Sequence, residues 1–183
     1  QYSCSTETNE YVIYADKTKR NLEKNRKITS HLNLYKKIID NSSSNSPYLH
    51  KPRAIDWDKP KIIAPQRSRM NTFGYNEIPW YAASDVFFIT KKEGNFSLKF
   101  ILALLNSKLF YLWLYFRGKR KGETLELIAK PLSEIPVKLP EEIEQLPMIT
   151  IVEKILSLND SKENPDQQMI QIKNYKEEID QLV

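Results

Sequence analysis

LKFILALLNSKLFYLWLYFRGKRKGE (residues 98–123) joins a long apolar stretch to a short basic one. Residues 100–116 are apolar except at Asn106, Ser107 and Lys108. With Ser97 as a candidate N-cap, the stretch predicts a buried helix, broken near Asn106. Its apolar side chains recur at the spacings of three and four that are typical of a core-facing helix side: Leu98, Ile101, Leu102, Leu105, Leu109, Leu112, Trp113 and Phe116.

This apolar stretch is a poor candidate for a membrane span. Its seventeen residues, 100–116, are at the lower limit for crossing the hydrocarbon core of a bilayer. Three polar residues near the centre would be costly in that environment. We therefore predict that the stretch packs inside the protein and does not cross a membrane.

Four cations follow directly, at Arg117, Lys119, Arg120 and Lys121. Gly118 and Gly122 bracket three of them, and glycine lets the backbone adopt positive φ and approach a ligand closely. Lys and Arg can contact phosphate oxygens, and Arg also fits the acceptor edge of guanine. The run predicts either an anion-facing loop or a plain solvated basic turn.

The charge is divided unevenly along the chain. Residues 1–121 hold 22 Lys and Arg against 10 Asp and Glu, whereas residues 122–183 hold 6 against 13. A basic body of this kind attracts a polyanion, and nucleic acid is favoured because neutralising its phosphates releases counterions. An anionic membrane surface would attract the same charge, so the charge alone leaves both partners open.

Size and composition indicate one domain, or one domain with an appendage. The 183 residues are 40% hydrophobic, which is enough for a substantial core. Cys4 has no second cysteine to pair with, so a reducing cytoplasm is the expected compartment. The chain starts without Met and ends inside a helical pattern, so we expect a fragment of a longer protein.

Motifs for catalysis are missing from the sequence. His31, His50 and Cys4 do not form a zinc-ligand pattern, and there is no P-loop or dinucleotide fingerprint. A carboxylate two positions before a lysine, as some nucleases need, occurs only at Asp160 and Lys162, in a polar break. We therefore predict no catalytic activity, no cofactor and no metal for this chain by itself.

The N-terminal part reads as a strand at residues 11–14, an amphipathic helix at 25–40 and a linker at 41–47. Short apolar runs between prolines then predict strands at 61–64, 72–75 and 85–90. The run at 85–90 is apolar on both faces, which predicts a central strand. A further strand is expected at 125–128, and 130–137 should be extended because proline disfavours helix at the preceding residue. Aromatic residues in these patterns, such as Tyr75, Trp80 and Trp113, are expected to pack inward.

Two helices are predicted for the acidic end. The first carries apolar residues over 148–158, with Pro147 in its first turn. The second begins with Asn164 as N-cap and Pro165 at the first helical position. Its apolar side chains fit one partner helix and favour an antiparallel pair: Ile172, Tyr175, Ile179 and Leu182.

Five blocks in this order resemble the TaqI-like C-terminal specificity domain, the target-recognition part of bacterial restriction-modification adenine methyltransferases, including forms fused to a nuclease. The blocks are KIIAPQRSRMNTF (61–73), WYAASDVFFI (80–89), LLNSKL (104–109), GKRKG (118–122) and KPLSEIP (130–136), within residues 48–139. The ending EEIDQLV (177–183) also resembles the helix with which many such enzymes continue.

The resemblance implies a non-enzymatic DNA-recognition fragment of a type II adenine-N6 methyltransferase. Its partners would be double-stranded DNA and an N-terminal methyltransferase domain of the same chain, which would bind S-adenosylmethionine. Phosphate contacts are expected from Arg53, Arg117, Lys119 and Lys121. Arg67, Arg69, Asn71 and Arg120 are the candidates for reading base edges, since Arg pairs with guanine and Asn with adenine.

We thus expect an α+β fold, with a mixed or antiparallel sheet packed on buried helices and a spacer-like C-terminal helical pair. Residues 1–47 would lead into the domain, 48–140 would form the recognition core, and 141–183 the helical segment. Three alternatives stay open: half of a type I restriction specificity subunit, a protein-interaction adaptor that uses the C-terminal helices, and a peripheral membrane protein held by the basic face.

Overall fold

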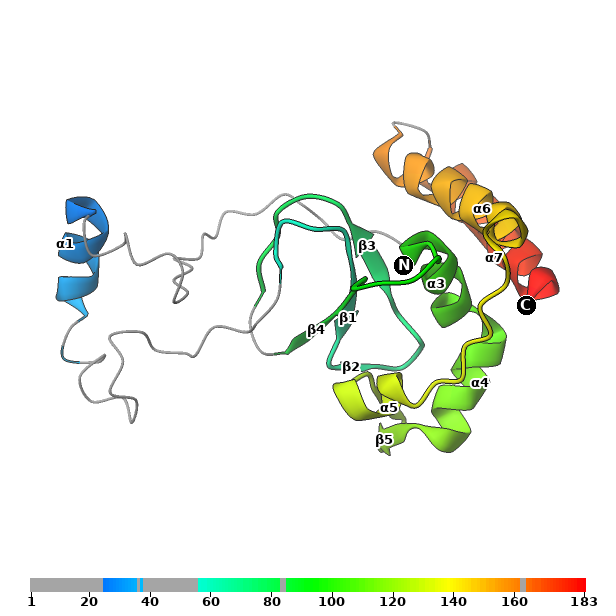
Figure 1. The fold of residues 1–183 in the computed structure, drawn as a ribbon, viewed down its shortest axis with the longest axis horizontal. Coiled ribbons are helices and arrows are strands. Elements are labelled where there is room, and N and C mark those ends of the chain that lie inside the picture. Colours follow the sequence, from blue (N-terminus) through cyan, green and yellow to red (C-terminus); the bar gives the residue numbers. More distant parts are fainter. Residues whose placement is uncertain (1–24, 36, 38–55, 83–84, 162–163) are drawn as a thin grey trace. The chain divides into compact units, whose positions relative to one another are not determined.

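The computed structural model describes residues 25–35, 37, 56–82, 85–161 and 164–183 (Figure 1). The chain divides into two units, and Thr8–Ile55 forms one of them. Within that unit α1 (Arg26–Leu34) begins at Asn25, whose side chain accepts hydrogen bonds from the backbone N–H groups of Lys27 and Ile28. The predicted helix at 25–40 is thus confirmed over α1, and none of its side chains is buried. The predicted strand at 11–14 and linker at 41–47 lie outside the described residues.

The second unit contains Asp56–Val183 and two small antiparallel sheets. The first has the order β3-β1-β4, formed by β1 (Lys61–Pro65), β3 (Gly74–Asn76) and β4 (Val86–Thr90). Ile62 lies opposite Tyr75 on one side and Ile89 on the other. This confirms three predicted strands, but the central one is β1 and β4 lies at the edge.

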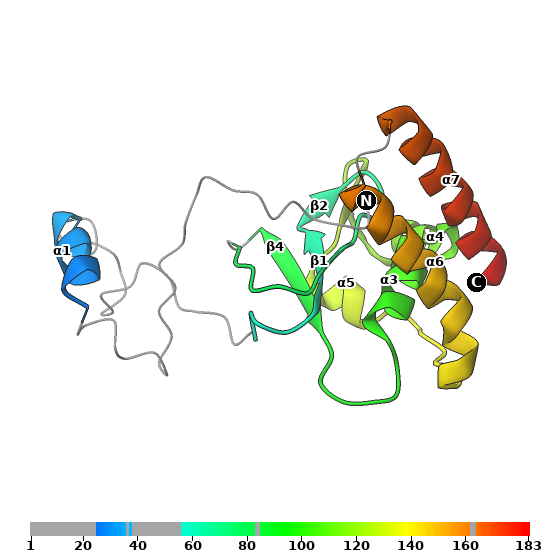
Figure 2. The same ribbon diagram turned by 90° about the horizontal axis from the view of Figure 1, so that it is seen from above.

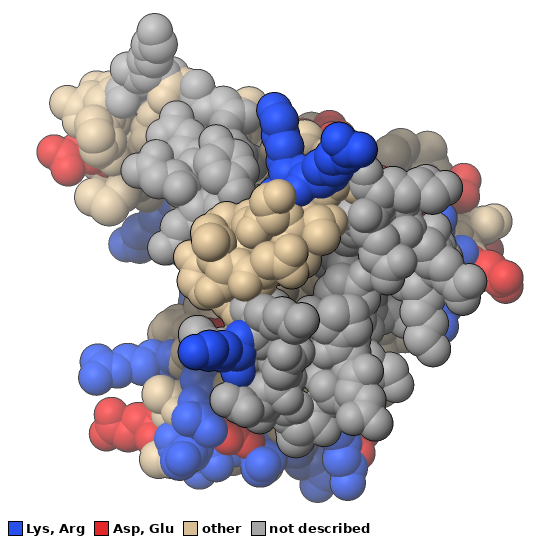
Figure 3. All heavy atoms as spheres, turned by 90° about the vertical axis from the view of Figure 1, so that its left-hand side faces the viewer, with Lys and Arg blue, Asp and Glu red and all other residues tan. Residues whose placement is uncertain are grey.

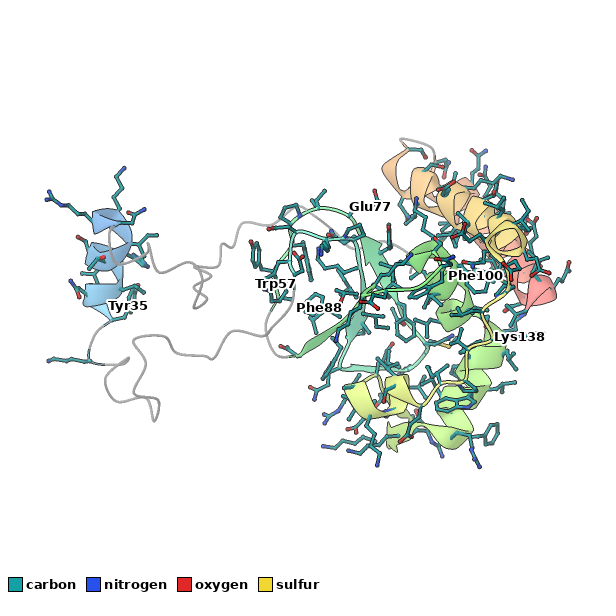
Figure 4. The ribbon with its side chains drawn as sticks, viewed as in Figure 1. Tyr35, Trp57, Glu77, Phe88, Phe100 and Lys138 are labelled. Carbon is teal, nitrogen blue, oxygen red and sulfur yellow. The ribbon has the colours of Figure 1, made fainter. Side chains whose placement is uncertain are left out.

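The wrong prediction for β4 has a physical cause. The edge strand is apolar on both faces because Phe87 and Ile89 pack against the core, whereas Phe88 meets aromatic rings on the other face. The ring centroid of Phe88 lies 5.0 Å from that of Trp57 and 6.1 Å from that of Trp80. Figure 4 shows Trp57 and Phe88 side by side. The sequence of β4 therefore resembles that of a central strand, because aromatic side chains cover its second face where a central strand would have buried ones.

The second sheet has the order β2-β6-β5, formed by β2 (Arg67–Ser68), β6 (Thr124–Glu126) and β5 (Lys119–Lys121). The chain passes from the first sheet to the second at Gln66. Its N–H donates to the carbonyl of Asp85 at 2.7 Å, and its carbonyl accepts from the N–H of Leu127 at 2.9 Å. One residue thus hydrogen bonds to the backbone beside both sheets and fixes their junction.

The apolar stretch forms two helices, α3 (Leu98–Asn106) and α4 (Lys108–Arg117), which meet at an angle of 67° (Figure 2). Ser97 caps α3, as predicted, by accepting from the N–H of Lys99. The break near Asn106 is also confirmed, and Ser107 caps the second helix.

The predicted apolar stripe does not continue through this break. Leu98, Leu102 and Leu105 are buried in α3, but Leu109, Leu112 and Phe116 are exposed in α4. Instead, α4 buries Phe110 and Leu114. The bend rotates the second helix out of phase with the first, so a single helical period could not predict its inner face.

Residues 129–133 form a short helix, α5 (Ala129–Ser133), where an extended segment was predicted. Pro131 is the third helical residue. A proline in the first turn is tolerated because the N–H that it lacks has no acceptor within the helix there.

The C-terminal pair consists of α6 (Glu142–Asp160) and α7 (Pro165–Leu182). The two helices contact each other and run in opposite directions, as predicted (Figure 2). Helix α6 begins earlier than predicted, because Glu141 and Glu144 form a capping box. Pro147 therefore lies inside the helix and leaves the carbonyl of Ile143 without its helical donor, but Ile143 is 71% exposed and water can serve there.

The core of this unit joins the first sheet, α3, α4 and α6. Its members include Ile62, Phe73, Leu102, Leu114 and Ile155. Tyr75 and Trp113 pack against it, as predicted. Among the described residues no single helix is long and apolar enough to cross a bilayer, although the bent pair α3 and α4 together meets that criterion.

Lys61 is a fully buried lysine at the start of the central strand. Its Nζ donates to the carbonyl oxygens of Trp57 at 2.8 Å, Lys59 at 2.9 Å and Ile78 at 2.9 Å. These bonds hold the segment before β1 and the segment after β3 around one ammonium group. A buried carbonyl without a donor is costly, so this lysine stabilises both connections.

We expect Lys61→Met to lower the free energy of unfolding by roughly 2–4 kcal/mol, because three carbonyls lose their donor while the volume is kept. Urea denaturation of the 183-residue chain measures this loss. Lys92→Met, at an exposed lysine after β4, is the matched control and should change stability by less than about 0.5 kcal/mol. Equal losses in the two variants would contradict the role given to Lys61.

Candidate nucleic-acid interface

The β2-β6-β5 sheet gathers four of the predicted site residues. Lys119, Arg120 and Lys121 form the exposed outer strand β5, and Arg67 lies on β2 across the sheet. The strand register places Arg67 and Lys119 on opposite sides of Glu126. Cations separated by more than fifty residues in the sequence thus lie on one small sheet.

Glu126 holds two of these cations. Its Oε1 lies 3.3 Å from Nε of Arg67, and its Oε2 lies 2.8 Å from Nζ of Lys119. The carboxylate side chain is only 8% exposed, against 45% for Arg67 and 63% for Lys119. The Lys119 ammonium, and to a lesser degree the Arg67 guanidinium, hold the pKa of Glu126 below its usual value. Glu126 therefore stays ionised and fixes both side chains.

The two glycines of the basic run serve the backbone. Gly118 ends α4, and a Cβ at this position would lie 2.5 Å from the carbonyl oxygen of Leu114. Gly122 has φ +61° and begins the two-residue turn between β5 and β6, where hairpin geometry requires positive φ. The predicted anion-facing loop is thus a β-hairpin, and its three cations are exposed on the strand β5.

Arg120 is placed by an aromatic ring. Its guanidinium carbon lies 4.1 Å from the ring centroid of Tyr115 in α4. The same ring makes an edge contact with Phe116, which is 73% exposed next to the basic strand. An Arg stacked on an aromatic face keeps its charge while the ring restricts its orientation.

Three predicted cations are exposed and have no ion pair within the described part of the chain: Arg69 after β2, Arg117 at the end of α4, and Lys121 on β5. Figure 3 shows Lys and Arg side chains gathered at the lower edge, the end at which β5 lies in Figure 1, with a few acidic side chains among them. Arg53 lies outside the described residues.

Asn71 is buried, and its side-chain amide is already hydrogen-bonded within the protein. Its Nδ2 donates to the carbonyls of Leu105 at 2.7 Å and Ser107 at 2.8 Å, on both sides of the break between α3 and α4. Reading adenine would require the same amide hydrogens. This placement argues against the predicted role of Asn71 at a base edge.

Two residues of this surface escaped the sequence analysis. Glu126 was read only as part of an apolar strand, and Tyr115 only as part of a helix. A carboxylate in a short strand directly after a basic run could have indicated an ion pair for Glu126. Its pairing with Arg67, however, depends on strand register between segments far apart in the sequence. Among the described residues, no group of three or more His, Cys, Asp or Glu could hold a metal ion.

The chain matches the family of TaqI-like C-terminal specificity domains over residues 2–137. It is similar to the type II methyltransferases M.HincII of Haemophilus influenzae and M.HindII of Haemophilus influenzae strain Rd. Each is 41% identical over 59 residues, 32% of this chain but only 12% and 11% of the respective enzyme. The matched segment thus spans only about an eighth of the length of these relatives.

A solved structure shares the fold. It is the Type IIL restriction-modification enzyme MmeI in complex with DNA, matched at a TM-score of 0.61 and 14% identity. The match covers 85% of this chain and 23% of that one.

Glu126→Gln should reduce the dependence of the free energy of unfolding on pH in the acid range. Since Lys119 and Arg67 lower the folded-state pKa of Glu126 below 4.5, their ion pairs stabilise the fold above that pH. The contribution is lost as the pH falls through the folded-state pKa. The difference in free energy of unfolding between wild type and variant, from urea denaturation, should therefore be largest near neutrality and shrink in acid. Glu134→Gln, at an exposed carboxylate, is the control, and a pH-independent difference for Glu126→Gln would count against these ion pairs.

Asn71→Ala should lower the free energy of unfolding by about 2 kcal/mol, because the carbonyl of Leu105 loses the amide donor and that of Ser107 is left with the N–H of Tyr111. Asn174→Ala, on the exposed face of α7, should change it by less than about 0.5 kcal/mol. If Asn71→Ala kept full stability and instead changed which DNA sequence the chain prefers, the structural role would be wrong.

Proposed function

The chain belongs to the family of TaqI-like C-terminal specificity domains, and on that basis we propose that it recognises a target sequence in double-stranded DNA for a type II adenine-N6 methyltransferase. The observation that carries this proposal is the arrangement of the β2-β6-β5 sheet. Arg67, Lys119, Arg120 and Lys121 come together there, above a buried scaffold. A rigid platform of cations suits a ligand with regularly spaced phosphates.

The proposed DNA contacts are of two kinds, to phosphates and to base edges. Arg117, Lys119 and Lys121 would contact phosphates, which fix the position and orientation of the duplex without reading its sequence. Arg67, Arg69 and Arg120 would face base edges, where Arg fits guanine. Asn71 is left out of this set because its amide holds the helix break. Arg53, outside the described residues, stays a candidate for a phosphate contact.

Methyl transfer would belong to another part of the same polypeptide. The same 59 residues make up 32% of this chain but 12% and 11% of M.HincII and M.HindII, so these enzymes are nearly three times as long, which leaves room for a catalytic domain that binds S-adenosylmethionine. We expect that domain on the N-terminal side and the parent enzyme in the cytoplasm. A base inside a duplex must be extruded before methylation, and a separate recognition domain can hold the duplex in register meanwhile. A fused nuclease is compatible with the same arrangement.

The helical pair α6 and α7 would act as a spacer next to the recognition core. Val152, Ile155 and Ile179 are buried between the pair and the rest of the unit, so the helices are part of the same folded body. Reading the gene around this segment would separate the proposal from a type I specificity subunit, which would carry a second recognition unit with its own helices.

Lys121→Gln should weaken binding of the chain to duplex DNA and reduce the slope of log K against log salt concentration by about 0.9, the value for one lost phosphate contact. Fluorescence anisotropy at several salt concentrations measures both quantities. Lys173→Gln, at an exposed lysine of α7, is the matched control and should leave the slope unchanged. Wild-type binding that does not depend on salt, or no binding at all, would refute the proposal.

A further inference from the structure

We propose that Arg67 reads a guanine with its two terminal nitrogens, and that Glu126 is the residue that positions it. This inference rests on the proposed DNA-recognition function and names one base contact within it. Its basis is the ion-paired triad of Arg67, Glu126 and Lys119 on the basic sheet.

The hydrogen bond that Arg67 makes leaves the two terminal nitrogens of its guanidinium group available. Nε donates to Oε1 of Glu126 at 3.3 Å, so the edge that includes Nε is already used. The terminal nitrogens make no hydrogen bond with any residue that the structure describes, and the side chain is 45% exposed. The end of the guanidinium thus presents two parallel donors, which match the O6 and N7 acceptors of guanine.

The carboxylate that holds Arg67 is itself held firmly. Glu126 lies directly opposite Arg67 in the strand register and is 8% exposed. The backbone bond from Leu127 N–H to the carbonyl of Gln66 ties the two strands together next to this pair. A base-reading side chain needs this kind of fixed support, because a small misplacement loses a bidentate contact.

Lys119 completes the arrangement by compensating the charge of Glu126. Its ammonium lies 2.8 Å from the second carboxylate oxygen, so the triad carries a net charge of +1. A bare carboxylate at this place would repel the phosphates of an approaching duplex. With Lys119 present, Glu126 can orient Arg67 without making the surface repulsive to DNA.

The other arginines lack this support. Arg69 and Arg117 have no ion pair among the residues that the structure describes. Arg120 is stacked on the Tyr115 ring, which restricts its plane but does not anchor Nε. Arg67 is therefore the arginine whose terminal donors have the best-defined direction.

The test is a selection from duplex DNA with a randomised central window, using the 183-residue chain as wild type, Arg67→Lys, Glu126→Gln and Arg26→Lys, the last at an exposed arginine of α1. Wild type should enrich a guanine at one position that Arg67→Lys makes degenerate, with a loss of preference there of roughly ten- to a hundredfold. Glu126→Gln should weaken the preference at the same position and at no other. Arg26→Lys, the matched control, should leave every base preference unchanged.

Each outcome decides something. A guanine preference that survives in Arg67→Lys overturns the inference, and so does a loss spread evenly over all positions. Loss in Arg67→Lys with no change in Glu126→Gln removes the positioning role of Glu126. Thermal unfolding checks that each variant is folded, and Arg67→Gln replaces Arg67→Lys if the latter is not. Salt-dependent binding by wild type without any enriched sequence refutes this inference alone, whereas no binding refutes the proposed function as well.

Discussion

The Asp56–Val183 unit depends on four hydrogen bonds that hold the break between α3 and α4. Asn71 donates to the carbonyls of Leu105 and Ser107, while the Asn106 side chain accepts from and donates to the backbone of Phe73. The connection between β2 and β3 is thereby fastened to the point where the helix turns by 67°. Because of this turn, α3 stays in the core while α4 leads the chain out to β5. The position of every cation on β5 follows from that turn, since a strand can only start where the helix before it ends.

Helix α4 connects regions of opposite charge. At its first turn, Asp180 of α7 accepts from the N–H of Lys108 at 2.7 Å, and its carboxylate also pairs with the ammonium of Lys108. At its other end are Arg117 and the basic strand β5. An acidic group at a helix N-terminus and a basic one at its C-terminus both stabilise the helix dipole. The acidic C-terminal helices therefore support the fold at the end of α4 that lies away from the basic sheet, and their charge is not placed among the cations of β5.

The basic sheet carries exposed positive charge, part of which is neutralised by the buried carboxylate of Glu126. A strand of three consecutive cations is costly by itself, since like charges repel over short distances. One buried carboxylate, Glu126, offsets part of this repulsion and at the same time fixes two of the four cations on the sheet. The remaining charge stays available to a polyanion. Two of the side chains that we propose for DNA contacts are thus also held by ion pairs within the fold.

The sequence by itself determined the elements that depend on local chemistry: the buried helix with its Ser97 cap, the break near Asn106, the start of α7 at Asn164 and Pro165, and the α+β class. It also located the basic run, because charge is read directly from composition. It could not determine the edge position of β4, the exposed face of α4, the amide contacts of Asn71 or the partner of Glu126. Each of these depends on which distant segments meet, and in a sheet this register is set by residues such as Gln66 and Leu127 that lie about sixty positions apart. Local periodicity contains no information about such pairs, so only the tertiary structure decided which of the predicted cations are held together and which amide is already used.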